Sequence, residues 1–395
     1  MLAGAVEHVP VYNATLMGGQ YFFRTDRASL SGNAQVVAAP ILRLDDKWAV
    51  IPVWSSAYQG TKGVGDGVGA GTLFQQQMDH RIGFSALHTP DDSQWRLKPS
   101  VSYKRQYLKE TRDETWGKGL FDYEKIAVGF EAENVYKEPF SYRLGLDVYR
   151  IKFPNYETLE SAAGVDPQGN PLGRELASKN VLDSWNVQAS LSGSRPFPYD
   201  DPKVSVSGGY SLLYQRFPDQ RLVNRRGAFE NAMRNDFQQS LNAAVGHPSR
   251  PWGLRLDSSF AASFVYNRSN QNTFDAARTQ YIEDAYSYWS VGAGPAVTLS
   301  WGDRKRPTWA SLGLRWSRVN FLGRLAQNAD GLYLGEKQHQ DRYIASVAYG
   351  YPIAPGFQLK VQTNWLWQSS NQAYEKTYAY TYRTANYLMG FTWEY

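Results

Sequence analysis

The feature of this sequence that most limits its possible folds is a long alternation of apolar and polar residues. In residues 204–215 one face carries Val, Tyr and Leu, whereas the other carries Ser, Gly and Gln. The same period of two recurs in residues 252–266 and 357–368. A period of two indicates a β-strand with one apolar face. A soluble strand averages about 5–6 residues, whereas a tilted strand that crosses a bilayer needs about 9–11. The pattern therefore favours strands that span a membrane.

The connections between these segments alternate in length. One set is short and rich in Pro, Asp and Gly, which form tight turns: residues 44–46, 89–92, 136–139, 197–201, 247–251, 302–307 and 353–356. The other set is long and polar: residues 60–71, 110–119, 155–181, 218–231, 269–279 and 323–337. Tight turns at one rim and long loops at the other are typical of an up-and-down membrane barrel.

Counting these connections predicts about sixteen strands. Seven tight turns join fourteen of them, one more precedes the set near residues 19–26, and the last covers residues 377–395. The expected fold is therefore all-β: a transmembrane antiparallel up-and-down β-barrel with short periplasmic turns and long extracellular loops. A large soluble all-β protein would explain the alternation, but it would not explain the rhythm of the connections.

Aromatic residues make up 15% of the chain, and many lie where the two membrane interfaces are expected. Trp and Tyr prefer the level of the lipid headgroups. The periplasmic girdle is predicted to contain the tryptophans beside the tight turns: Trp48, Trp95, Trp252, Trp301 and Trp309.

The C-terminal strand carries the clearest family signal. Its alternating face ends the chain on an aromatic residue: Tyr387, Met389, Phe391, Trp393 and Tyr395. This segment resembles the C-terminal assembly signal of bacterial outer-membrane β-barrel proteins. The resemblance implies location in the bacterial outer membrane and contact with the barrel-assembly machinery during biogenesis. It also implies outer-membrane lipid and lipopolysaccharide as partners.

Two groups within that class have the expected strand number, and the sequence leaves both open. General porins have a long third outer loop, but here the third, residues 110–119, is short and the fourth, residues 155–181, is the longest. The other group comprises the sixteen-stranded exopolysaccharide-export barrels, which often follow helical repeat domains. We expect residues 1–18 to be an N-terminal periplasmic segment or linker remnant and residues 19–395 to be the barrel.

The polar half of each strand should face the lumen. The charged residues predicted to line it are Asp79, Arg81, Arg96, Lys98, Lys104, Lys125, Glu131, Glu133, Arg143, Asp147, Arg255, Asp257, Arg315 and Lys360. They could form a selectivity surface, or they could pair across strands and stiffen the wall. Because the bases outnumber the acids, we expect a mild preference for anions.

Other functional classes receive little support from the sequence. The chain has no Cys and only five His, it shows no Gly-x-Ser-x-Gly motif, and its bases do not cluster. We therefore expect no catalytic residues, no cofactor, no metal and no nucleic acid.

Three functions remain as hypotheses. The first is an outer-membrane channel or export pore for a hydrophilic solute or polymer. The second is a barrel that anchors a multi-protein envelope machine through periplasmic or surface protein partners. The third is a barrel hydrolase, which a Ser or His clustered with an acid on the outer face would favour.

Overall fold

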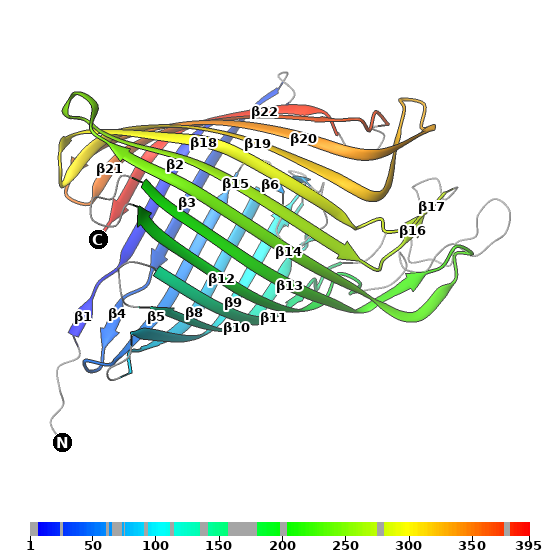
Figure 1. The fold of residues 1–395 in the computed structure, drawn as a ribbon, viewed down its shortest axis with the longest axis horizontal. Coiled ribbons are helices and arrows are strands. Elements are labelled where there is room, and N and C mark those ends of the chain that lie inside the picture. The colour runs from blue at the N-terminus through cyan, green and yellow to red at the C-terminus, as the bar shows by residue number, and fades with distance from the viewer. Residues whose placement is uncertain are drawn as a thin grey trace.

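The chain folds into one closed antiparallel sheet (Figure 1). The computed structural model describes residues 7–23, 27–60, 63–64, 73–74, 76–90, 94–110, 114–134, 141–156, 180–197, 204–274, 280–374 and 380–395. Eighteen strands share the main sheet, of which β1 and β4 are three-residue extensions and the other sixteen form the wall. The predicted fold class and strand number are confirmed. No helix of the described residues has the length and apolarity needed to cross a membrane.

The wall strands follow one another in chain order. They are β2 (Tyr12–Phe23), β3 (Arg27–Ala38), β5 (Trp48–Gln59), β8 (Gln76–His88), β9 (Trp95–Lys109), β10 (Tyr123–Asn134), β11 (Ser141–Lys152), β12 (Ser184–Phe197), β13 (Val204–Val223), β14 (Phe229–Ser249), β15 (Arg255–Ser269), β18 (Tyr288–Asp303), β19 (Arg306–Gln327), β20 (Tyr333–Ala354), β21 (Phe357–Ser370) and β22 (Tyr382–Glu394). The short elements are β1 (Glu7–Val9), β4 (Ile41–Arg43), β6 (Gly63–Val64), β7 (Leu73–Phe74), a single 3-10 turn (Pro251–Gly253), β16 (Thr273–Phe274) and β17 (Tyr281–Ile282).

The barrel closes where β2 pairs with β22. The register runs from Asn13 opposite Glu394 to Phe23 opposite Thr384. The backbones of Tyr12 and Tyr395 exchange two hydrogen bonds of 2.9 Å, so both chain ends lie at the same rim. Closure pairs every wall strand on both sides, which removes the open sheet edges that would otherwise recruit other strands.

The two strand faces differ sharply in chemistry. In β10 the outward side chains Ile126, Val128 and Phe130 are each about half exposed to solvent, at 59%, 59% and 46%. The alternate residues of the same strand include Lys125 and Glu131, which point inward. Large exposed apolar side chains recur on one face of the wall strands. An apolar surface this extensive is unfavourable in water, but it matches the lipid-facing band of a membrane barrel.

The first strand begins earlier than expected. Residues 12–18 belong to β2 and pair with both β22 and β3, so the predicted boundary at residue 18 is wrong. Alternation is weak here because Met17 and Tyr21 are buried on the inward face, while Gly18 and Gln20 lie on the outward face.

Two segments predicted as long loops are mostly strand. Residues 218–231 and 323–337 continue the hairpins β13–β14 and β19–β20, which extend past their neighbours at the outer end (Figure 1). Each hairpin closes in a short turn in which one asparagine side chain, Asn224 or Asn328, accepts two backbone hydrogen bonds. Register shifts separate these extensions from the regular wall. Most of the predicted fourth loop, residues 157–179, lies outside the described residues.

Candidate functional site

The candidate site is the interior face of the barrel. The structure places all fourteen charged residues predicted for the lumen on the strand face opposite the exposed apolar side chains. Ten of them come from the four consecutive strands β8 to β11, so the charge is concentrated on one wall: Asp79, Arg81, Arg96, Lys98, Lys104, Lys125, Glu131, Glu133, Arg143 and Asp147.

Near the rim that carries the short turns, these charges pair across strands. Lys98 Nζ lies 3.0 Å from Glu131 and 2.7 Å from Glu133. Arg96 and Arg143 reach the same two carboxylates at 3.3–3.4 Å. Farther along the wall, Lys104 pairs with Asp79 at 3.1 Å. These charged residues therefore form ion pairs between neighbouring strands, and their charges largely cancel one another.

The facing wall is built from small side chains. Ala244 of β14, Ser263 of β15 and Gly292 of β18 line a cavity of about 440 Å³ that extends to Arg315 of β19. At Gly294 an added Cβ would lie 1.9 Å from the carbonyl oxygen of Leu314, so only glycine fits between β18 and β19 there. Small neutral residues on one wall leave space in the lumen opposite the charged wall.

A second cavity lies at the outer end of the interior, and we call it the outer-mouth pocket. Its volume is about 440 Å³. The lining contains four basic residues and one acidic residue together with aromatic, aliphatic and amide side chains: Lys104, Tyr123, Lys125, Tyr149, Ile151, Leu182, Leu213, Gln215, Phe217, Arg234, Asp236, Gln238, Asn267, Tyr286, Tyr288, Phe321 and Arg324.

Arg234 is the most constrained base in the outer-mouth pocket. Its Nε donates to both carboxylate oxygens of Asp236 at 3.1 Å, and its Nη1 donates to Gln220 at 3.1 Å. The guanidinium carbon lies 4.2 Å from the ring centroids of both Phe217 and Tyr286. Stacking on two rings and a carboxylate partner together compensate the burial of this guanidinium, which is only 8% exposed.

Arg324 approaches Tyr286 from β19. Its Nε donates to the carbonyl oxygen of Ala285 at 2.7 Å, and its guanidinium lies 4.5 Å from the centroid of Phe321. Among the described residues, no carboxylate lies within ion-pair distance of Arg324. Its charge is therefore not neutralised by the described part of the chain.

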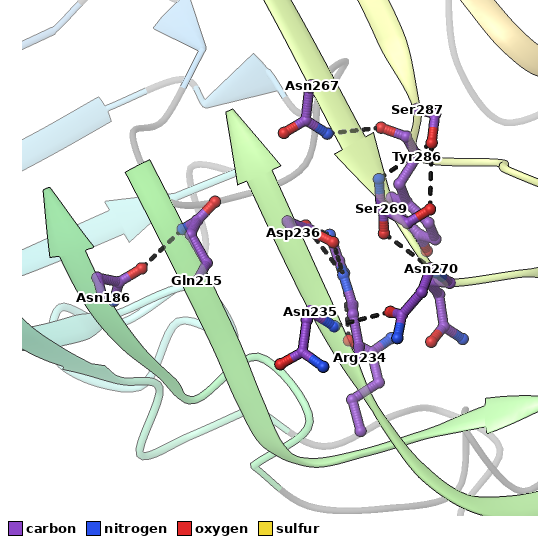
Figure 2. Close-up of polar contacts among 12 residues, drawn as sticks. Asn186, Gln215, Arg234, Asn235, Asp236, Asn267, Ser269, Asn270, Tyr286 and Ser287 are labelled. Atoms are coloured by element: carbon purple, nitrogen blue, oxygen red, sulfur yellow. Dashed lines mark hydrogen bonds and ion pairs between the residues drawn. The ribbon is translucent and has the colours of Figure 1, made fainter. Parts of the chain in front are cut away.

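Side-chain contacts hold the segment before β18 in place (Figure 2). Asn267 donates to the Tyr286 carbonyl oxygen at 2.9 Å, and Ser269 N–H donates to Ser287 Oγ at 3.0 Å (Figure 2). Asn235 N–H donates to the side chain of Asn270 at 2.7 Å (Figure 2). These bonds fix the backbone that carries Tyr286 between the two arginines.

The sequence did not single out this pocket. Arg324 falls in residues 323–337, which were assigned to a loop. The available signal was that Arg234 and Asp236, two residues apart, share a strand face. Their partners Phe217 and Tyr286 come from β13 and from the turn before β18.

The tryptophans predicted for the periplasmic girdle do not all face the membrane. Trp48 is 41% and Trp252 is 92% exposed, and Trp95 and Trp301 share the outward parity of their strands. Trp309 is wrong as a girdle residue. It is paired with Gly350, and its indole ring occupies the space that a Cβ on Gly350 would fill on the inward face. Neighbouring residues of a strand point to opposite faces of the sheet. A position close to a turn therefore does not show whether a tryptophan points to the membrane or to the lumen.

The predicted C-terminal signal lies on the outward face of β22. Tyr387, Met389, Phe391, Trp393 and Tyr395 are between 40% and 69% exposed. The strand is paired on both sides, with β21 and β2. Recognition of this segment by the assembly machinery stays a prediction.

The outward face holds one Ser–His contact. Ser56 Oγ and His80 Nδ1 are 3.0 Å apart. Within the described ranges, no carboxylate lies within ion-pair distance of His80, and no group of three His, Asp or Glu residues could hold a metal ion. The contact lacks the acid that the hydrolase hypothesis required. The absence of an enzymatic activity stays a prediction.

Fold and surface together define the class of this chain: it is a closed antiparallel β-barrel with an apolar outer band of the kind that faces lipid. Among solved structures it is similar to OccD3 (OpdP) of Pseudomonas aeruginosa, with 9% identity and a TM-score of 0.49 over 99% of this chain and 93% of that one. It is similar to OmpT of Vibrio cholerae, with 9% identity and a TM-score of 0.47 over 100% and 99% of the two chains. It is also similar to a bacterial polysaccharide outer membrane secretin, with 8% identity and a TM-score of 0.47 over 98% of each chain. No protein-family model and no curated protein matches the sequence.

Proposed function

We propose that the chain is an outer-membrane channel for hydrophilic solutes and that it prefers anionic ones. The observation that carries this proposal is the outer-mouth pocket, whose lining contains four bases and one acid. A solute that enters from outside passes these side chains before it reaches the paired charges near the periplasmic rim.

The architecture supports a channel. Barrels of sixteen strands are wide enough for an aqueous path. The small-residue wall of β14, β15 and β18 faces the charged wall, which favours an open passage over a packed interior. Low-dielectric walls focus the field of like charges, so a basic constriction raises the local concentration of anions.

Arg324 is the residue on which selectivity depends most in this proposal. Arg234 is neutralised by Asp236, and Lys104 is neutralised by Asp79. Arg324 has no such partner in the described part of the chain. A unit charge in water acts on an ion about 6 Å away with roughly 0.7 kcal/mol. A positive charge therefore favours an anion about threefold and disfavours a cation about threefold, which changes their permeability ratio about tenfold.

The test is single-channel recording of the refolded protein in a planar bilayer under a salt gradient. The wild type should conduct with a reversal potential on the anion side. Arg324→Gln should lower the anion-to-cation permeability ratio about tenfold. Lys305→Gln, in an exposed periplasmic turn, removes the same charge outside the lumen and should leave the ratio unchanged.

Other results would overturn the proposal. A cation-selective wild type, or equal changes of the permeability ratio in both variants, would show that the outer-mouth pocket does not determine the selectivity. A barrel that folds, as judged by its heat-dependent gel shift, but does not conduct would favour the anchoring hypothesis.

A further inference from the structure

The outer-mouth pocket offers a ligand two kinds of group at once: a positive charge with free donors, and neutral hydrogen-bond acceptors. From this combination we infer that the pocket binds sugar acids, that is, hydroxylated rings that carry one carboxylate. The inference rests on the proposed function, because it names the class of anion that the channel admits. A pocket of about 440 Å³ is large enough for a ligand of this kind.

Arg324 supplies the site for the carboxylate. Its Nε donates to the carbonyl oxygen of Ala285 at 2.7 Å, but its two terminal nitrogens donate no hydrogen bond within the described part of the chain. The rings of Phe321 and Tyr286, whose centroids lie 4.5 and 5.6 Å away, hold the guanidinium in place. Aromatic rings attract a guanidinium without a formal charge of their own. The terminal nitrogens are therefore left to bind both oxygens of a ligand carboxylate.

Gln215 supplies an acceptor whose orientation is fixed by its neighbours. Asn186 Nδ2 donates to the carbonyl oxygens of Tyr149 and Ser184, at 3.4 and 3.3 Å. Asn186 Oδ1 therefore accepts a 2.8 Å hydrogen bond from Gln215 Nε2 (Figure 2). Because the amide nitrogen of Gln215 is used in this bond, its Oε1 is the atom left for a ligand in the pocket.

Asn267 supplies a second acceptor in the same way. Its Nδ2 donates to the carbonyl oxygen of Tyr286 at 2.9 Å, so its Oδ1 is the atom left for a ligand (Figure 2). Gln238 is directly paired with Asn267 and also lines the pocket. The side-chain oxygens of Gln215, Gln238 and Asn267 accept no hydrogen bond from any residue that the structure describes. The three residues come from the consecutive strands β13, β14 and β15, so the acceptors are neighbours on the inward face.

These groups discriminate between classes of anion. Chloride would gain the charge of Arg324, but it has no donor for the amide oxygens, whereas the hydroxyls of a sugar donate to them. An ammonium group would also donate to amide oxygens. However, the carboxylate of the described lining, Asp236, is already engaged by Arg234. An amino acid would therefore place its cation among bases without a free acid beside it, which is unfavourable.

The test measures binding to the refolded wild-type barrel in detergent by saturation-transfer difference NMR. Three probes share a pyranose-type ring: galacturonate carries the carboxylate and the hydroxyls, methyl galactoside lacks the carboxylate, and tetrahydropyran-2-carboxylate lacks the hydroxyls. Loss of a charge-assisted hydrogen bond weakens binding about tenfold or more, and loss of two neutral ones weakens it roughly fivefold. Galacturonate should therefore bind about tenfold more tightly than methyl galactoside and about fivefold more tightly than tetrahydropyran-2-carboxylate.

Two variants assign these preferences to residues. Arg324→Gln should abolish the preference for galacturonate over methyl galactoside, and Gln215→Leu should reduce the preference over tetrahydropyran-2-carboxylate about threefold. Gln362→Leu removes a half-buried lumen amide of β21 outside the pocket and should keep both preferences. A general loss of structure would instead weaken all three probes alike. If Gln215→Leu does not fold, Gln238→Leu tests the same point, because the Gln238 side chain bonds only to Ser240.

Planar-bilayer recording of the same preparation in salt alone tests the channel proposal separately. Equal affinity for the three probes, or preferences that survive both variants, would overturn the sugar-acid inference even if the wild type conducts anions. A barrel that is silent or cation-selective but keeps both preferences would uphold the sugar-acid site and would overturn the channel proposal instead.

Discussion

The carboxylate of Asp122 accepts a hydrogen bond of 2.8 Å from the backbone N–H of Leu108, across the outer end of the β9–β10 hairpin. The same carboxylate accepts a 3.2 Å bond from Gly119 N–H. Leu108 and Asp122 are each only 1% exposed. The aspartate immediately before β10 therefore satisfies a buried backbone donor at the end of β9.

This arrangement recurs at other outer hairpin ends. Asp183, just before β12, accepts from Phe153 N–H at 2.8 Å. Ser287 and Thr381, just before β18 and β22, accept from Ser269 and Ser370 N–H at 3.0 and 3.3 Å. In each case the residue that precedes a descending strand caps the ascending strand beside it.

We expect Asp122→Ala to open the outer end of the β9–β10 hairpin. The substitution leaves two backbone donors unsatisfied, and a buried unsatisfied donor costs about 1–3 kcal/mol. Amide hydrogen exchange of residues 106–109 should accelerate roughly five- to a hundredfold. Asp330→Ala, at an exposed turn, is the control. Unchanged protection in both variants would show that water replaces the carboxylate without cost.

The same carboxylates should titrate above their ordinary range. Burial raises the pKa of Asp122 and of Asp183, and the backbone hydrogen bonds oppose this effect only in part. A raised pKa in the folded state means that the charged form is disfavoured there. Local stability is therefore greatest below the ordinary pKa of 3.8, falls as pH rises through the raised pKa, and is constant above it. Carboxyl carbon NMR titration measures both values directly, and a pKa at or below 3.8 would contradict this prediction.

Glu133→Gln should make the lumen more anion-selective. Glu133 neutralises Lys98 and Arg96 and is 3.4 Å from Arg143, so its loss leaves uncompensated bases near the periplasmic rim. The anion-to-cation permeability ratio should rise about tenfold, by the same Coulomb estimate as for Arg324. Asp303→Asn, at the exposed end of β18 beside a short turn, is the matched control. An unchanged ratio for Glu133→Gln would contradict this prediction and would mean that the lumen charges do not act on the ions that pass.

Gly294→Ala should destabilise the barrel, whereas Gly313→Ala should not. A Cβ at Gly294 would lie 1.9 Å from the Leu314 carbonyl oxygen, but a Cβ at Gly313 would meet nothing within 4 Å. Overpacking of this kind costs about 1–3 kcal/mol. Urea unfolding in lipid vesicles, followed by Trp fluorescence, should show a lower midpoint for the first variant alone. Equal midpoints would mean that β18 and β19 separate there without strain.

The sequence by itself determined that this chain is an antiparallel barrel of sixteen strands. Alternation and connection length are local properties of the chain, so they can be recognised without knowledge of any tertiary contact. It also determined which face most of the charged lumen residues occupy, because they alternate with apolar residues of the same strand and those mark the outward face. Three features needed the tertiary structure. Trp309 and the start of β2 were misassigned where alternation is weak, and the outward extension of β13–β14 and β19–β20 depends on pairing between strands.

The outer-mouth pocket was decided by the tertiary structure alone. Phe217, Arg234, Tyr286 and Arg324 come from β13, β14, the segment before β18, and β19, and their contacts depend on the register between those strands. Alternation specifies which face a residue occupies. It does not specify height, because a shift of two residues in register preserves the face and moves the side chain along the barrel.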